Sequence, residues 1–131
     1  MRIDINSDTG ESFGAYTIGH DAGLFTSITS ANVAAGFHAG DPSVLRDTIR
    51  LAKQHGVAVG AHPGFPDLVG FGRRELNVTP REAEDMVLYQ VAAVAGVAAA
   101  GSAPAAEAAP SGTRIANAHS VGPITLGRTW S

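Results

Sequence analysis

Cysteine is absent from the 131 residues of this chain. Disulfide bonds and thiolate metal sites are therefore excluded, and any bound metal ion must take nitrogen and oxygen ligands. An excess of basic residues is also missing, because 9 Lys and Arg stand against 12 Asp and Glu, and the formal net charge is −3. Without a basic stripe on the chain, nucleic acid is not an expected partner.

A long uninterrupted apolar run is missing as well. The most apolar stretch, residues 86–100, contains Gln90 and is shorter than the roughly 20 residues that a membrane span requires. The first residues, MRIDINSD, carry charges where a signal peptide has an apolar core. We therefore expect a cytoplasmic protein without a membrane partner, and the length suits one domain.

Three short segments have the features of β-strands. Residues 2–6 alternate in polarity, so that Ile3 and Ile5 would share one face of a strand that the polar segment SDTGES then ends. Residues 31–35 and 57–61 are mostly apolar runs followed by glycine or proline, which is typical of buried strands.

Two helices are marked by their capping residues. Asp41 is a good N-cap before Pro42, and apolar residues at helical spacing then continue to Gly56. A capping box, Thr79-Pro80-Arg81-Glu82, opens a second and longer helix. A weak helix is also expected over residues 20–28. The apolar side of the long helix is expected to consist of Val87, Val91, Val94 and Ala98.

Strands and helices thus alternate over residues 1–100. This order predicts an α/β fold with a parallel sheet and helices packed outside it. Three strands do not close a barrel, so these residues are expected to form part of a larger α/β unit. Residues 101–131 begin with GSAPAAEAAPSGT, a composition that predicts a poorly packed tail. Exposed strand edges would favour self-association, so a homo-oligomer is one expectation.

Two similar turns follow the second and third predicted strands: AAGFHAGDP around His38 and VGAHPGFPD around His62. In parallel α/β sheets, ligands bind beyond the carboxyl ends of the strands, and neighbouring strands lie about 4.8 Å apart. Asp8 and Glu11 follow the first predicted strand at the same end. Two histidines with a carboxylate are a common ligand set for a divalent metal ion. We therefore predict a centre for a metal ion or substrate at Asp8, His38 and His62.

Other interpretations of these residues stay open. A single histidine in a turn is more often a solvated or structural residue, and His55 suits the carboxyl end of a helix for its charge alone. Arg73 and Arg74 either hold a carboxylate or phosphate or are ordinary loop charges. Asp41 is first of all a helix cap, and any role at the site is secondary.

Four segments carry a family resemblance: DINSDTGESFG, SANVAAGFHAGDP, GVAVGAHPGFPDLVGFGRR and VLYQVAAVAG. They resemble the LamB/YcsF family, the A subunit of ATP-dependent 5-oxoprolinase, over about residues 1–100. The resemblance implies a distorted β/α barrel similar to the glycoside hydrolase/deacetylase fold, of which this chain would form an incomplete part.

The resemblance also implies an activity. Family members are implicated in hydrolysing the lactam bond of 5-oxoproline to give L-glutamate, using ATP and two further subunits, B and C. Activation of the ring carbonyl by ATP would precede attack by water. The catalytic residues would be Asp8, Glu11, His38 and His62, with Glu11 a candidate general base. The substrate-binding residues would be Asn6, Asp41, Arg73 and Arg74, with the two arginines holding anionic groups.

The chain departs from the family pattern in two ways. The family usually has cysteine where this chain has Ser7 and Ala35, so neither position is expected to hold an essential nucleophile. Residues 112–117, GTRIAN, match the family's lead-in to a Lys-Pro-His-Gly motif, but AHSVGP follows here. We therefore expect little or no 5-oxoprolinase activity from this chain alone. Two alternatives are an inactive fragment or interaction module that binds partner subunits, and a metal-dependent, deacetylase-like hydrolase.

Overall fold

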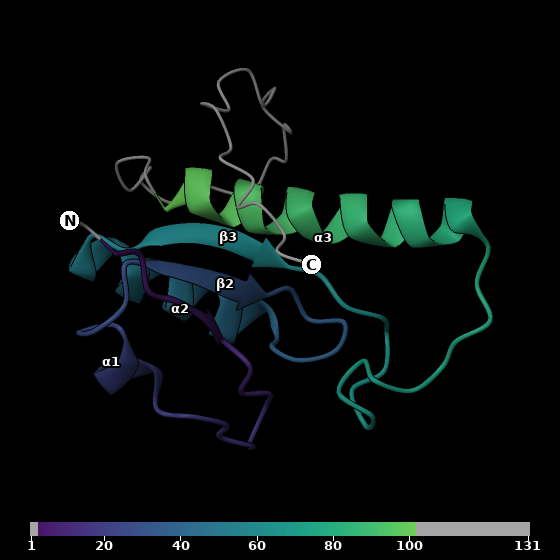
Figure 1. The fold of residues 1–131 in the computed structure, drawn as a ribbon, viewed down its shortest axis with the longest axis horizontal. Helices are drawn as coiled ribbons and strands as arrows, with labels where there is room; N and C mark the ends of the chain where they lie inside the picture. Colours follow the sequence, from purple (N-terminus) through teal and green to yellow (C-terminus); the bar gives the residue numbers. More distant parts are fainter. Residues whose placement is uncertain (1–2, 102–131) are drawn as a thin grey trace, which may run out of the picture.

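The computed structural model describes residues 3–101, which form a three-stranded parallel sheet with accompanying helices (Figure 1). The strands are hydrogen-bonded in chain order, β1-β2-β3. The predicted α/β class and parallel sheet are thus confirmed, whereas the tail predicted beyond Gly101 lies outside the described residues. The elements are β1 (Asn6–Thr9), α1 (Asp21–Leu24), β2 (Ser30–Ala34), α2 (Pro42–His55), β3 (Ala58–His62) and α3 (Pro80–Ala100).

The first strand lies further along the chain than the alternating pattern predicted. β1 pairs in parallel with β2, and Asp8 lies opposite Asn32. Ile3 and Ile5, which were expected to share one face of the strand, precede β1 and are 72% and 53% exposed. The segment SDTGES was predicted to end the strand, but its first three residues belong to it. Backbone pairing with β2 defines this strand, and a polar sequence can adopt it because β-propensity depends strongly on context.

The two faces of the sheet differ in character. Val33 of β2 packs with Leu45 and Ile49 of α2 and with Val94 of α3 in one buried cluster. Burying each such side chain contributes about 1.5–3 kcal/mol, which holds both long helices against this face. The opposite face carries polar side chains instead and is described with the site below. A second buried cluster lies on the helix side as well and consists of Phe25, Ile28, Ala31, Ala52 and Val57.

The first long helix, α2, begins and ends where the sequence predicted. The Asp41 carboxylate accepts hydrogen bonds from the backbone N–H groups of Ser43 and Val44, at 2.8 and 2.9 Å. A cap of this kind is worth about 1 kcal/mol. Gly56 ends the helix with a φ of 66°, a left-handed conformation that glycine adopts without strain. The helix thus starts directly after the loop that carries His38. The short helix α1 covers only part of the predicted range 20–28.

The second long helix, α3, begins at the predicted capping box of Thr79 and Glu82. The predicted apolar stripe is correct in part. Val94 is buried, but Val87 is 47% exposed, and the fully buried Gln90 takes a place on the inner side. An apolarity pattern could not find Gln90, because this side chain is drawn inward by hydrogen bonds to a loop.

The same helix continues from its cap through the whole apolar stretch 86–100. α3 spans 21 residues and, by length and composition alone, could cross a membrane, with a mean hydropathy of 1.3 and 11% of the apolar window buried. In the structure α3 packs on β3 and α2. The absence of a membrane partner stays a prediction, as do the incomplete, distorted β/α barrel and the likeness to the deacetylase fold.

Candidate active site

The sheet face away from the helices carries a row of polar side chains. Asn32 of β2 donates from Nδ2 to Oδ1 of Asn6 at 2.8 Å and to Oδ1 of Asp8 at 3.1 Å. Asn6 in turn donates to the Ser30 hydroxyl at 2.9 Å. Parallel register brings these residues together, because Asn6 lies opposite Ser30 and Asp8 opposite Asn32. Asn32 was not predicted as a site residue, and its signal was a lone polar residue inside an apolar strand.

His62 extends this polar row onto the third strand. It is the last residue of β3, and its Nδ1 atom lies 3.7 Å from Asp8 Oδ1 and 3.9 Å from Glu11 Oε1. The Glu11 side chain is 20% exposed and the Asp8 side chain 49%. Burial raises the pKa of Glu11, and the nearby Asp8 carboxylate raises it further against the opposing effect of His62. A raised pKa makes the Glu11 carboxylate a stronger base, which suits a group that accepts a proton from water.

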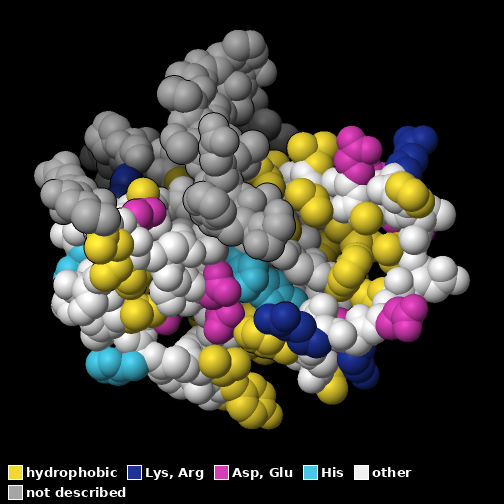
Figure 2. All heavy atoms as spheres, viewed as in Figure 1, with side chains coloured by type: hydrophobic (Ala, Val, Ile, Leu, Met, Phe, Trp, Pro, Cys, Tyr) yellow, Lys and Arg dark blue, Asp and Glu magenta, His cyan; other side chains and the backbone are white. Residues whose placement is uncertain are grey.

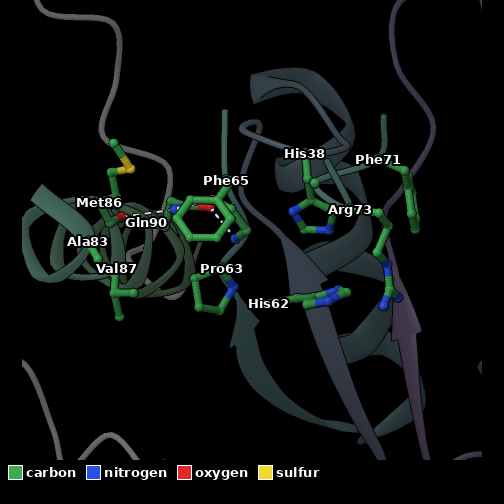
Figure 3. Close-up of a pocket in the computed structure, with 12 residues that line it drawn as sticks. His38, His62, Pro63, Phe65, Phe71, Arg73, Ala83, Met86, Val87 and Gln90 are labelled. Atoms are coloured by element: carbon green, nitrogen blue, oxygen red, sulfur yellow. Dashed lines mark hydrogen bonds between the residues drawn. The ribbon is translucent and has the colours of Figure 1, made fainter. Parts of the chain in front are cut away.

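His38 lies against His62 although it belongs to the loop after β2, whereas His62 ends β3. The two ring centroids are 4.5 Å apart, with the planes at 65°, and the close-up shows the rings one above the other (Figure 3). His38 is only 3% exposed, and neither ring nitrogen has a hydrogen-bond partner among the described residues. Burial and the neighbouring His62 lower the pKa of His38, so its imidazole is neutral at physiological pH.

Two glycines in the loop that follows His62 leave room for the His38 side chain. A Cβ atom on Gly64 would lie 2.2 Å from His38 Nδ1, and one on Gly72 would lie 2.8 Å from His38 Cβ. Any side chain at either position would displace the imidazole. Phe71, with a φ of 55°, places its ring edge-on to His38 at a centroid distance of 5.4 Å. Non-glycine residues rarely adopt this φ, so the loop holds an unusual backbone conformation beside the site.

A pocket of about 350 Å³ opens between the histidines and α3. This volume is at the lower end of the range of about 300–1,000 Å³ that is typical of small-molecule sites. Phe65 and Phe71 line it, together with Arg73, whose side chain lies beside the histidines in the close-up (Figure 3). On the molecular surface, histidine atoms are visible between acidic and basic side chains (Figure 2).

Gln90 supports the pocket from α3. Its Nε2 atom donates to the carbonyl of Gly64 at 2.9 Å, and its Oε1 atom accepts from the N–H of Gly64 at 2.9 Å (Figure 3). The side chain is fully buried. Because Gly64 contacts His38, Gln90 holds the loop on which the histidine rests. This role was not predicted. The one feature of the sequence that sets Gln90 apart is that its amide lies within an apolar stretch of the helix.

Two of the predicted substrate-binding residues have other partners. The Asp41 carboxylate accepts hydrogen bonds from the helix start and from the N–H of Gly14, and these lower its pKa. The Arg74 guanidinium forms an ion pair with the buried Asp67 carboxylate. Neither side chain lines the pocket, whereas Arg73 does. The structure therefore brings Asn6, Asp8, Glu11, His38, His62 and Arg73 to one region and leaves Asp41 and Arg74 outside it.

Comparison with known proteins identifies the family of the chain. A model of the LamB/YcsF family matches residues 3–118. The chain belongs to the LamB/YcsF family. It is similar to the A subunit of 5-oxoprolinase from Limosilactobacillus fermentum, with 64% identity over 95 residues, and to that from Thermococcus onnurineus, with 62% identity over 94 residues. Each match covers 72% of this chain.

A solved structure supports the fold. The lactam utilization protein from Thermus thermophilus superposes with a TM-score of 0.76 at 54% sequence identity, covering 79% of this chain and 42% of that one. This LamB/YcsF chain matches only 38% and 37% of the two curated relatives. The histidine pair and the pocket lie within residues 3–118 of this chain, which match the family model.

Proposed function

We propose that this chain acts within an ATP-dependent 5-oxoprolinase, which hydrolyses the lactam bond of 5-oxoproline to give L-glutamate. The observation that supports the proposal is the position of the site. The paired histidines, their carboxylates and Arg73 all fall within residues 3–118, which match the family model. The reaction itself is proposed from the names of similar proteins, which are called the A subunit of 5-oxoprolinase.

The pocket chemistry suits a small cyclic amide that carries a carboxylate. We assign the substrate carboxylate to Arg73, because a guanidinium binds a carboxylate through two parallel hydrogen bonds. Phe65 and Phe71 offer apolar walls for the ring carbons. The lactam carbonyl would then face His38 and His62. Asn6 belongs to the polar row that leads to this position and acts as a hydrogen-bonding neighbour.

Hydrolysis requires a water molecule to attack the carbonyl carbon while the carbon–nitrogen bond breaks. The attacking water loses a proton, and the ring nitrogen gains one as the amino group of glutamate forms. Glu11 is assigned as the base that takes the proton from water, and His62 beside it as the group that transfers a proton to nitrogen. Asp8 orients His62 through its carboxylate, and ATP is proposed to activate the ring carbonyl before water attacks.

The dependence on ATP and on partner subunits limits the activity that we expect from this chain alone. ATP use and partner subunits B and C belong to the whole assembly, and this chain matches less than two fifths of its curated relatives. The purified chain, with ATP and 5-oxoproline but no partner subunits, is therefore expected to release little or no glutamate. Robust ATP-dependent glutamate release by the chain alone would contradict this account.

A binding experiment tests the role of the pocket without requiring turnover. Saturation-transfer NMR should detect 5-oxoproline bound to the chain, and Arg73→Ala should remove the signal. The matched control is Arg50→Ala, because Arg50 pairs with Asp47 on the surface of α2 and lies outside this pocket. Equal signals from both variants would show that Arg73 does not hold the substrate.

Two other functions each have one observation in their favour. The histidine pair with carboxylates favours a metal-dependent, deacetylase-like hydrolase, which would release acetate from N-acetylated sugars without ATP. The exposed apolar residues of α3, including Leu88 and Tyr89, each 65% exposed, favour a non-catalytic module that binds a partner subunit. Acetate release in the first case, or subunit binding without any turnover in the second, would replace the proposal above.

A further inference from the structure

The buried nitrogens of the two histidines lack partners. Both ring nitrogens of His38 and Nδ1 of His62 are shielded from solvent and make no hydrogen bond among residues 3–101. Buried polar atoms are nearly always paired in folded proteins, because each unpaired group costs about 1–3 kcal/mol. Three such atoms at one point of the molecule indicate that a bound species completes the site.

The donors around these nitrogens suit a metal ion. One ligand atom each from Glu11, His38 and His62 lies within 4.8 Å of the others. A tetrahedral ion with ligand distances of about 2.1 Å holds its donors about 3.4 Å apart. The Glu11 side chain lies on a loop and is partly exposed, so a change of its rotamer can close the remaining gap.

We propose that Glu11, His38 and His62 form a binding site for a divalent transition-metal ion. Two imidazoles and a carboxylate are the ligand set that such ions favour. The carboxylates of Asp8 and Asp21 add negative charge near Glu11, where His62 and Arg73 act in the opposite sense. With an ion bound, Glu11 and His62 would act as its ligands, so the proton transfers assigned to them above apply to the metal-free chain only. Direct binding measurements therefore test this site separately from lactam hydrolysis.

Glu11 rather than Asp8 is the carboxylate ligand in this proposal. Asp8 already accepts a hydrogen bond from Asn32 at 3.1 Å, and its side chain is 49% exposed. Its Oδ1 atom lies 3.7 Å from Nδ1 of His62, so it orients that ring from beside the site. The ligand set predicted from the sequence, with Asp8 as the carboxylate, is thereby revised at one member.

The ligand types also predict which ions bind. Imidazole nitrogen favours Zn²⁺ and Co²⁺, whereas Mg²⁺ and Ca²⁺ prefer sites made of oxygen atoms only. When bound, the ion would polarise a carbonyl group or a water molecule in the pocket. Glu11 would hold the ion from the loop after β1, His38 from the loop after β2, and His62 from the end of β3.

Titration of the metal-free full chain with Zn²⁺ in a calorimeter, and with Co²⁺ by visible absorption, tests the proposal. We expect one equivalent of either ion to bind, with no competition from a hundredfold excess of Mg²⁺. Glu11→Gln should weaken binding at least tenfold, and His62→Gln should abolish it. Asp8→Asn should weaken binding less than Glu11→Gln does.

Matched controls separate the site from adventitious binding. His55→Gln and Glu84→Gln replace exposed residues outside the site and should leave affinity and stoichiometry unchanged. Far-UV circular dichroism confirms that each variant is folded, and Glu11→Gln preserves the shape of a partly exposed side chain. Unchanged affinity in a folded Glu11→Gln variant, greater loss from Asp8→Asn, or no binding of either ion by the folded chain would overturn the proposal.

Discussion

The two histidine turns have similar sequences but hold their imidazoles by different means. His38 lies in the loop after β2, is 3% exposed and contacts glycines and an aromatic ring. His62 ends β3 itself and faces the carboxylates of Asp8 and Glu11. Steric packing thus determines the position of the His38 ring, whereas the His62 ring lies beside two carboxylates.

The position of His38 nevertheless depends on the loop that follows His62. Gly64 and Gly72, which leave room for His38, both belong to the loop that follows His62. That loop is in turn held by Gln90 of α3. The site is therefore one structural unit formed by segments from two β/α units, and substitutions should affect the two histidines unequally.

The largest effect is expected from the histidines themselves. His38→Ala or His62→Ala, made at the matching positions of a full-length relative, should lower 5-oxoproline turnover by about 10²–10⁴-fold. His38→Ala should also lower the melting temperature, because it leaves a cavity, whereas His62→Ala should not. Glutamate release and thermal unfolding measure the two effects. Unchanged turnover in either variant would return that histidine to a structural role.

A methyl group at Gly64 should have the next largest effect. Gly64→Ala would place Cβ 2.2 Å from His38 Nδ1, so we expect a loss of about 1–3 kcal/mol in unfolding free energy and a displaced imidazole. Gly96→Ala is the control, because its Cβ would meet no atom within 4 Å and alanine favours a helix by about 0.5–1 kcal/mol. Urea unfolding should give opposite signs, and a stable Gly64→Ala chain would contradict the packing account.

A similar loss is expected when the amide of Gln90 is removed. Gln90→Leu would leave the N–H and carbonyl groups of Gly64 unpaired, at a cost of about 1–3 kcal/mol. Gln54→Leu, on the exposed side of α2, should change the unfolding free energy by less than about 0.5 kcal/mol. Hydrogen exchange at Gly64 should be faster in the first variant alone. Equal exchange rates in both variants would mean that Gln90 does not hold the loop.

The smallest effect concerns acid stability. Hydrogen bonds from Arg74 and from the loop backbone lower the pKa of Asp67 from 3.8 to about 2. The carboxylate therefore contributes stability above about pH 4, and this contribution is lost as the pH falls toward 2. Asp67→Asn should flatten the stability profile between these pH values. Asp47→Asn, which removes an exposed ion pair with Arg50, should not. Parallel profiles for the two variants would contradict the assignment.

The elements with strong local signals were predictable from the sequence. The Asp41 cap, the Gly56 terminus and the capping box at Thr79 each depend on a few neighbouring residues, and all three predictions are confirmed. The meeting of His38, in the loop after β2, with His62, the last residue of β3 rather than the first residue after it, was predictable for a related reason. Parallel strands end at the same edge of a sheet, so the order of elements alone brings such residues together.

Features that depend on long-range contacts were not predictable. β1 is polar and is defined by its register with β2, so a pattern of apolar residues placed it too early. Gln90 is buried because Gly64, 26 positions away, offers it both a donor and an acceptor. The relative positions of Asp8 and Glu11 around His62 likewise depend on the path of the loop after β1, which no local pattern specifies.

The central claim is that the two histidine turns form a single ligand site. Imidazole ¹⁵N NMR of the full chain during titration with Zn²⁺ tests it directly, because each histidine reports separately. The account predicts that the signals of His38 and His62 shift together and are complete at one equivalent, while those of His20 and His55 stay in place. A shift of His62 without His38, or shifts at different stoichiometries, would contradict it.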